Sequence, residues 1–180
     1  MSKDAKFYYP HYERSVFAYT IPAGELSSNS EILSSNYLPS KVVVGFVKSK
    51  AFYGEPSLSP FNFQSFDISE CDLTVDGESV FGRATTFEDD QMLTGYKQMY
   101  PDDKNQVTYS PDKFASSAFL MAFDLKPTDN NNFYQSRQGV LRFNVTFKNP
   151  LPENITAVIY IKKQAMLMLD KHGNPTVTHF

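Results

Sequence analysis

Within the run Val140 to Phe147, apolar and polar residues alternate strictly from Leu141 onward, and this pattern limits what the chain can fold into. Successive side chains of a strand point to opposite faces, so this pattern predicts a strand with one buried and one solvated face. The apolar positions are Leu141, Phe143, Val145 and Phe147, and the polar ones are Arg142, Asn144 and Thr146.

A second strand-like run, Ile155 to Leu169, follows after a short segment that contains Pro150 and Pro152. Proline has no backbone N–H to donate, so it ends a ladder. We interpret the two runs as an antiparallel hairpin at the end of the domain. Each strand has an apolar face, and a second sheet must cover those faces.

Further strands are predicted upstream. The β-branched run Lys41 to Val47 indicates a central strand that is buried on both sides. Asp76-Gly77 lies between two alternating runs and is a strong hairpin signal, because both central residues of such a turn need a positive φ. The remaining strand candidates include Arg14 to Ile21 and Ser116 to Leu125.

One helix is predicted, from Phe87 to Tyr100, because apolar residues recur there at roughly helical spacing after an acidic start. Lys48 to Pro60 and Lys126 to Ser136 are expected to be loops. For Phe61 to Phe66 two readings stay open: a strand, or a loop whose phenylalanines pack onto the core.

About eight strand candidates without alternating helices predict an all-β fold, an antiparallel two-sheet β-sandwich. Eight strands favour a jelly roll with one short helical insertion. The length of 180 residues suits one domain. We expect an N-terminal arm at 1–13, a single jelly-roll domain at 14–171 and a C-terminal tail at 172–180.

Composition and charge exclude several classes. The net charge of −3 argues against a binder of nucleic-acid backbones, so no specific nucleic acid is expected. The single cysteine, Cys71, cannot form an internal disulfide. No apolar run approaches a membrane span and no signal peptide is evident, so we expect synthesis in the cell interior and no membrane partner.

Catalytic and metal-binding patterns are not found in the sequence. The three histidines, His11, His172 and His179, show no zinc spacing, and Cys71 has no histidine near it in the sequence. The acidic groups Glu88–Asp90 and Asp102–Asp103 lack the ordered spacing of a cation site. We therefore expect no enzyme, no metal and no cofactor.

Aromatic residues are abundant, with 16 Phe and 11 Tyr. They fill a core or make contacts with other subunits, where aromatic residues are enriched. The candidate assembly contacts are Tyr8, Tyr9 and Tyr12 in the arm and Phe61, Phe63 and Phe66 further along.

Several ordered stretches resemble the capsid proteins of Polinton (Maverick) elements and adintoviruses. They are Val43–Val47, Ala51–Gly54, Pro60–Phe66, Leu73–Gly77, Phe119–Leu125, Gly139–Arg142, Val158–Tyr160 and Leu169–Lys171.

The resemblance implies a hexon-like major capsid protein with two jelly rolls, which trimerises into capsomers of an icosahedral virion. This chain has the length of one jelly roll and resembles the C-terminal one. The expected partners are other copies or a second jelly-roll domain. The alternative is a glycan- or receptor-binding jelly roll, which Asp129-Asn130-Asn131-Asn132 and other polar loops would serve.

Overall fold

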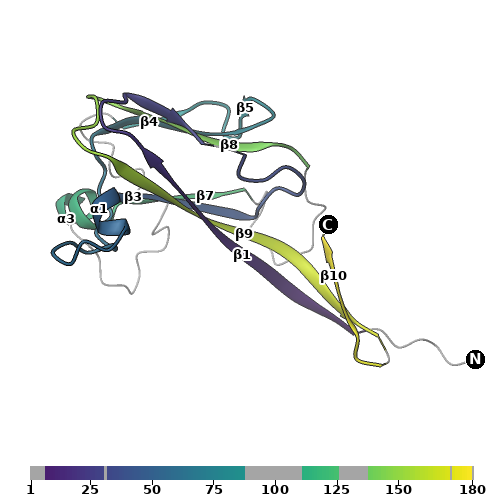
Figure 1. Ribbon diagram of the computed structural model, residues 1–180. Coiled ribbons are helices and arrows are strands. Elements are labelled where there is room, and N and C mark those ends of the chain that lie inside the picture. Colours follow the sequence, from purple (N-terminus) through teal and green to yellow (C-terminus); the bar gives the residue numbers. More distant parts are fainter. Residues whose placement is uncertain (1–6, 31, 88–110, 126–137, 171, 180) are drawn as a thin grey trace, which may run out of the picture.

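The computed structural model describes residues 7–30, 32–87, 111–125, 138–170 and 172–179. Two antiparallel sheets pack face to face, and a narrow arm of strands projects from one end (Figure 1). The first sheet has the order β1-β9-β3-β7, with β10 also paired to β9. The second has the order β2-β8-β4-β5, with β6 also paired to β4. The bounds are β1 Phe7–Ile21, β2 Ser27–Asn29, β3 Lys41–Lys48, β4 Ile68–Val75, β5 Glu78–Ser79, β6 Thr85–Thr86, β7 Leu120–Asp124, β8 Leu141–Phe147, β9 Ile155–Leu169 and β10 Pro175–His179.

The chain crosses between the two sheets at almost every long connection. β1, β3, β7 and β9 belong to the first sheet, and β2, β4 and β8, which lie between them in sequence, belong to the second. This wiring is that of a jelly roll, so the predicted fold class is confirmed.

The expected hairpin of the last two runs is wrong. Both strands form where the alternation predicted them, and β8 has every second residue buried. However, β8 pairs with β2 and β4, whereas β9 pairs with β1 and β3 in the other sheet. The segment 148–154 is long enough to cross between layers, and Leu151 within it is buried and bonds to Gly24 and Glu25. The two alternating faces therefore cover each other.

The predicted turn at Asp76-Gly77 is confirmed. Both residues have positive φ, +53° and +89°, and they connect β4 to β5. The Asp76 carboxylate also accepts a hydrogen bond from the backbone N–H of Val140 at 2.8 Å. Gly139 makes this approach possible, because a Cβ there would lie 2.5 Å from Cγ1 of Val75.

The predicted central strand is also confirmed, since β3 lies between β9 and β7. Val42, Val44 and Phe46 face the core and are fully buried. On the opposite face, Gly45 lies under Phe63 and Leu120.

The two described helices differ from expectation. α1, Ser49–Phe52, forms where a loop was expected, and α3, Pro111–Ser117, takes the first residues of the predicted strand Ser116 to Leu125, which begins only at Leu120. Nearly all of the helix expected at Phe87 to Tyr100 lies outside the described residues, as do the loop Lys126 to Ser136 and both acidic groups. Phe61 to Phe66 forms no strand, apart from one isolated bridge between Phe63 and Ala118.

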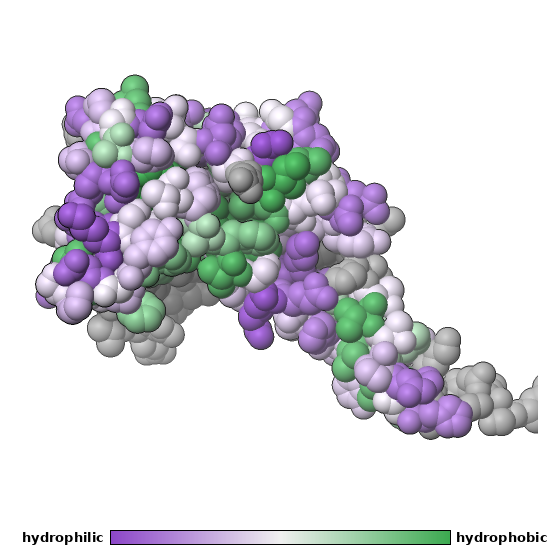
Figure 2. Space-filling model, viewed as in Figure 1, coloured by the Kyte–Doolittle hydropathy of each residue, from purple (hydrophilic) through white to green (hydrophobic). Residues whose placement is uncertain are grey.

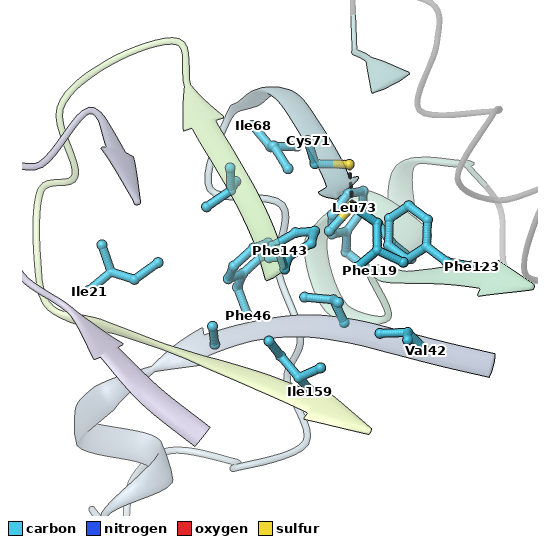
Figure 3. Packing of buried hydrophobic residues seen from close by; sticks show 14 of the residues in the cluster. Ile21, Val42, Phe46, Ile68, Cys71, Leu73, Phe119, Phe123, Phe143 and Ile159 are labelled. Atoms are coloured by element: carbon cyan, nitrogen blue, oxygen red, sulfur yellow. Dashed lines mark hydrogen bonds between the residues drawn. The ribbon is translucent and has the colours of Figure 1, made fainter. Parts of the chain in front are cut away.

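The core between the sheets is rich in phenylalanine (Figure 3). The Phe143 ring lies 6.4 Å from that of Phe46 and 6.1 Å from that of Phe123, centroid to centroid. Cys71 Sγ lies 3.6 Å from Sδ of Met121. Burial, together with the carboxylates of Asp72 and Glu70, raises the pKa of the Cys71 thiol to about 12, so this thiol is a structural group.

Candidate assembly surface

Three strands form the arm: the first half of β1, the second half of β9 and β10 (Figure 1). β1 begins at Phe7, so the predicted strand Arg14 to Ile21 extends into the segment expected as an N-terminal arm. β10 lies in the segment expected as a tail. β9 is the middle strand, because β1 pairs along one side of it and β10 along the other.

One face of the arm continues the core face of the sandwich. Within the sandwich, Ile155, Ala157, Ile159 and Ile161 alternate along β9 and are fully buried. The same parity continues through Lys163, Ala165, Leu167 and Leu169, so one lysine interrupts an otherwise apolar row. Tyr9 lies opposite Leu167 from β1, and Val177 lies opposite it from β10.

Phe7 and Tyr9 on this face remain 56% and 50% exposed. The strands of the second sheet lie over the sandwich part of β9 and do not reach the arm (Figure 1). The arm thus carries the sequence pattern of a core strand without a described layer above it.

The other face of the arm holds Tyr8 and Tyr12. Tyr8 lies opposite Met168 and is 56% exposed. The Lys162 ammonium lies 4.0 Å from the centroid of the half-buried Tyr12 ring, a cation–π contact that orders both side chains. Tyr8 is therefore available for contacts, whereas Tyr12 is already engaged within the chain.

The three phenylalanines have three different environments. Phe61 is 79% exposed. Phe63 is half-buried and packs over Gly45, and its carbonyl accepts a hydrogen bond from the Phe119 N–H at 3.1 Å. Phe66 is partly buried against the core and has a φ of +50°. For Phe63 and Phe66 the reading in which a loop packs onto the body describes the structure.

The candidate residues form two separate groups. The tyrosines lie on β1, which runs into the arm, whereas Phe61, Phe63 and Phe66 lie in the loop between α1 and β4, at the other end of the sandwich (Figure 1). Hydrophobic residues gather over the sandwich and again along the arm (Figure 2).

Sequence reasoning missed Val16, Phe17 and Val177, which are exposed apolar residues of β1 and β10. Val16 and Phe17 are adjacent and therefore point to opposite faces. The sequence did contain a signal for the β1 residues. Apolar residues occupy consecutive positions there and so lie on both faces of the strand, whereas a strand that is buried on one face needs them only at every second position.

The histidine, cysteine and acidic side chains of the described residues do not gather at one place. In the described part of the chain no group of three or more His, Cys, Asp and Glu side chains could hold a metal ion. His11 and His179 both pair with Ala165, from opposite sides of β9, and His172 lies in the turn before β10. Among the described helices none is long and apolar enough to cross a membrane.

No protein-family model matches the chain. One protein of Caenorhabditis elegans, "Uncharacterized protein F54H12.2", is 25% identical over 181 residues, which cover 94% of this chain and 43% of that protein. The chain therefore spans less than half the length of this relative.

Solved virus structures resemble the chain over nearly its whole length. A chain of the Sputnik virophage aligns with a TM-score of 0.59 at 13% identity, covering 97% of this chain and 39% of its own length. The mavirus major capsid protein gives a TM-score of 0.56 at 11% identity, with 97% and 41% covered. A chain of the PBCV-1 capsid gives 0.56 at 11% identity, with 98% and 52% covered. The fold of this chain is that of a viral capsid jelly roll.

Proposed function

We propose that this chain is a structural jelly-roll module of a viral capsid, of the Polinton (Maverick) and adintovirus type or a genome-integrated remnant of one. The observation that carries the proposal is the arm. It extends the apolar face of a capsid-type jelly roll beyond its own second sheet, exposing Phe7 and Tyr9 on that face and Tyr8 on the opposite one. Exposed aromatic residues on a rigid strand scaffold are typical of contacts between proteins.

In this proposal the module is not a catalyst. Its partners are other copies of the chain or a second jelly-roll domain, arranged in a trimeric capsomer of the virion. In this proposal 14–171 is the jelly-roll domain, and the flanking segments 1–13 and 172–180 contribute strand residues 7–13 and 175–179 to the arm. The matched virus chains are longer, and this chain covers 39% to 52% of them.

The test is assembly in solution. The purified chain is examined by light scattering over a wide concentration range and by negative-stain electron microscopy. Each measurement is made on the chain alone and on the chain mixed with a longer capsid protein encoded by the same genetic element. We expect discrete oligomers and, with the longer protein, capsomer-sized particles. A chain that stays monomeric at all concentrations and never enters particles would overturn the proposal.

A double variant locates the contact. Tyr8→Ser with Tyr9→Ser removes two exposed rings of the arm and is expected to weaken assembly. Tyr53→Ser is the matched control, because Tyr53 is 74% exposed but lies beside α1 at the other end of the sandwich, where its hydroxyl is 3.4 Å from Oγ1 of Thr20 and far from the arm. An equal effect of both changes would mean that the arm is not the contact.

A further inference from the structure

β1 is the outermost strand of the first sheet. It pairs with β9 along its whole length, and its other edge meets no strand among the residues that the structure describes (Figure 1). Ten of its fifteen residues are exposed. The strand at the opposite edge of this sheet, β7, has five residues, of which one is exposed.

Exposed apolar side chains are concentrated on this edge strand. Of the twelve large hydrophobic residues that are exposed in the described structure, five belong to β1: Phe7, Tyr8, Tyr9, Val16 and Phe17. Val16 is 64% exposed and Phe17, although its side chain is on the core-facing parity, is 39% exposed.

The second half of β1 carries none of the devices that protect a sheet edge. Edge strands are usually short or interrupted by proline, a bulge or charge, since a free ladder of N–H and C=O groups pairs with other chains. Pro10, Glu13 and Arg14 interrupt the first half, whereas Ser15 to Ile21 contains no proline and no charge. The pairing of β1 with β9 is also regular throughout, with no bulge.

We propose that β1 is an interface between two copies of this chain, which pair antiparallel, edge to edge, and join their first sheets into one continuous sheet. This rests on the proposed function, in that it names one contact between copies of the chain; because the contact is two-fold, it lies outside the three-fold contacts of a trimeric capsomer. A second copy is the occupant because the strand is compatible with its own reversed sequence in one long register.

Symmetry limits the registers. A two-fold axis between two antiparallel edge strands stands perpendicular to the sheet, so each residue faces one of equal parity, and one residue lies opposite itself. Centring on Glu13 or on Arg14 sets like charges directly opposite each other, which is unfavourable. Centring on Ser15 is the longest remaining overlap and pairs Tyr9 through Ile21.

In this register Val16 lies opposite Arg14 of the second copy, and Phe17 lies opposite Glu13. The aliphatic part of each charged side chain then covers an exposed apolar residue. An overlap from Tyr9 to Ile21 forms about a dozen backbone hydrogen bonds, which is about the number that a whole protein interface usually contains.

Ser15→Cys tests the register directly. Opposite residues of an antiparallel pair have Cα atoms about 4.5 to 5.5 Å apart, which suits a disulfide. Under mild oxidation we expect most of the variant to become a covalent dimer on a non-reducing gel. Cys71 does not interfere, because it is buried.

Thr20→Cys is the matched control, since Thr20 is also exposed on β1 but would lie about 33 Å from its own copy in this register. It is expected to stay monomeric on the gel. A Ser15→Cys variant that stays monomeric, or that cross-links no better than Thr20→Cys, would overturn the edge pairing.

Val16→Lys provides a second measurement without cysteine. A lysine in the uncharged half of the strand should raise the dissociation constant of the dimer at least tenfold in sedimentation or light scattering. Leu26→Lys, at an exposed apolar position outside β1, should leave it unchanged. If Val16→Lys associates as strongly as the wild type, the copies meet at another surface. That result would refute the pairing through β1 but not the proposed function.

Discussion

The two halves of β9 carry the same alternation in two different settings. In the first half, Ile155, Ala157, Ile159 and Ile161 lie under the second sheet and are fully buried. In the second half, Leu167 and Leu169 continue the pattern in the arm, beside Phe7 and Tyr9, which are about half exposed. Alternation therefore specifies which side of a strand is apolar, but it does not specify whether the same chain covers that side.

The largest expected difference between these regions is in stability. Phe143→Ala removes a fully buried ring that packs against Phe46 and Phe123, so we expect the free energy of unfolding to fall by about 3–5 kcal/mol. Urea denaturation of both proteins measures the change. A loss below about 1 kcal/mol would mean that the two sheets do not share a packed core.

The outer face of the first sheet allows a second comparison. A Cβ at Gly45 would lie 2.6 Å from Cδ2 of Leu120 and 2.7 Å from Cδ1 of Phe63, so Gly45→Ala forces both side chains to move. We expect a loss of about 1–3 kcal/mol in the free energy of unfolding. Ala18→Val adds methyl groups to an exposed position of the same face and should change it by less than about 0.5 kcal/mol.

Alkaline pH tests the burial of Cys71. The folded thiol has a pKa of about 12 against an ordinary 9.0, so the unfolded chain loses this proton first as the pH rises. The stabilising contribution is complete below about pH 9 and declines above it. Between about pH 8 and pH 10 the wild type should lose about 1.4 kcal/mol more than Cys71→Ala does over the same series. Equal slopes of stability against pH would contradict a buried thiol.

The smallest effect is expected in the arm. Tyr9→Ser removes a ring that is half exposed and covered by no described layer, so the free energy of unfolding of the monomer should change by less than about 0.5 kcal/mol. Thermal unfolding at low protein concentration measures it. A loss comparable to that of Phe143→Ala would show that the arm packs against its own chain.

Local chemistry explains which parts of the fold were predictable. The alternation of β8, the β-branched run of β3 and the turn at Asp76-Gly77 each follow from neighbouring residues, and all three form as expected. Neighbouring residues in the sequence do not determine to which of the two sheets β9 belongs. It depends on pairing with β1 and β3, which lie more than a hundred residues away in sequence.

The candidate assembly residues show the same division. The exposed Tyr8 and the partly buried Phe66 are both aromatic residues in aromatic stretches, and only the long-range packing distinguishes them. Residue type predicted contacts with other subunits, but it could not show that Phe63 packs inside the chain over Gly45. The exposed Val16 was hidden within an ordinary strand pattern.

The pairing of β1 with β9 has a consequence for synthesis. Ile21 pairs with Ile155, which lies 134 positions later, so β1 leaves the ribosome long before its partner exists. At about 5–20 residues per second, the wait is on the order of ten seconds. During that time β1, the most aromatic strand of the domain, has no partner strand within its own chain. Neighbouring nascent chains on the same messenger RNA would present identical unpaired strands to one another.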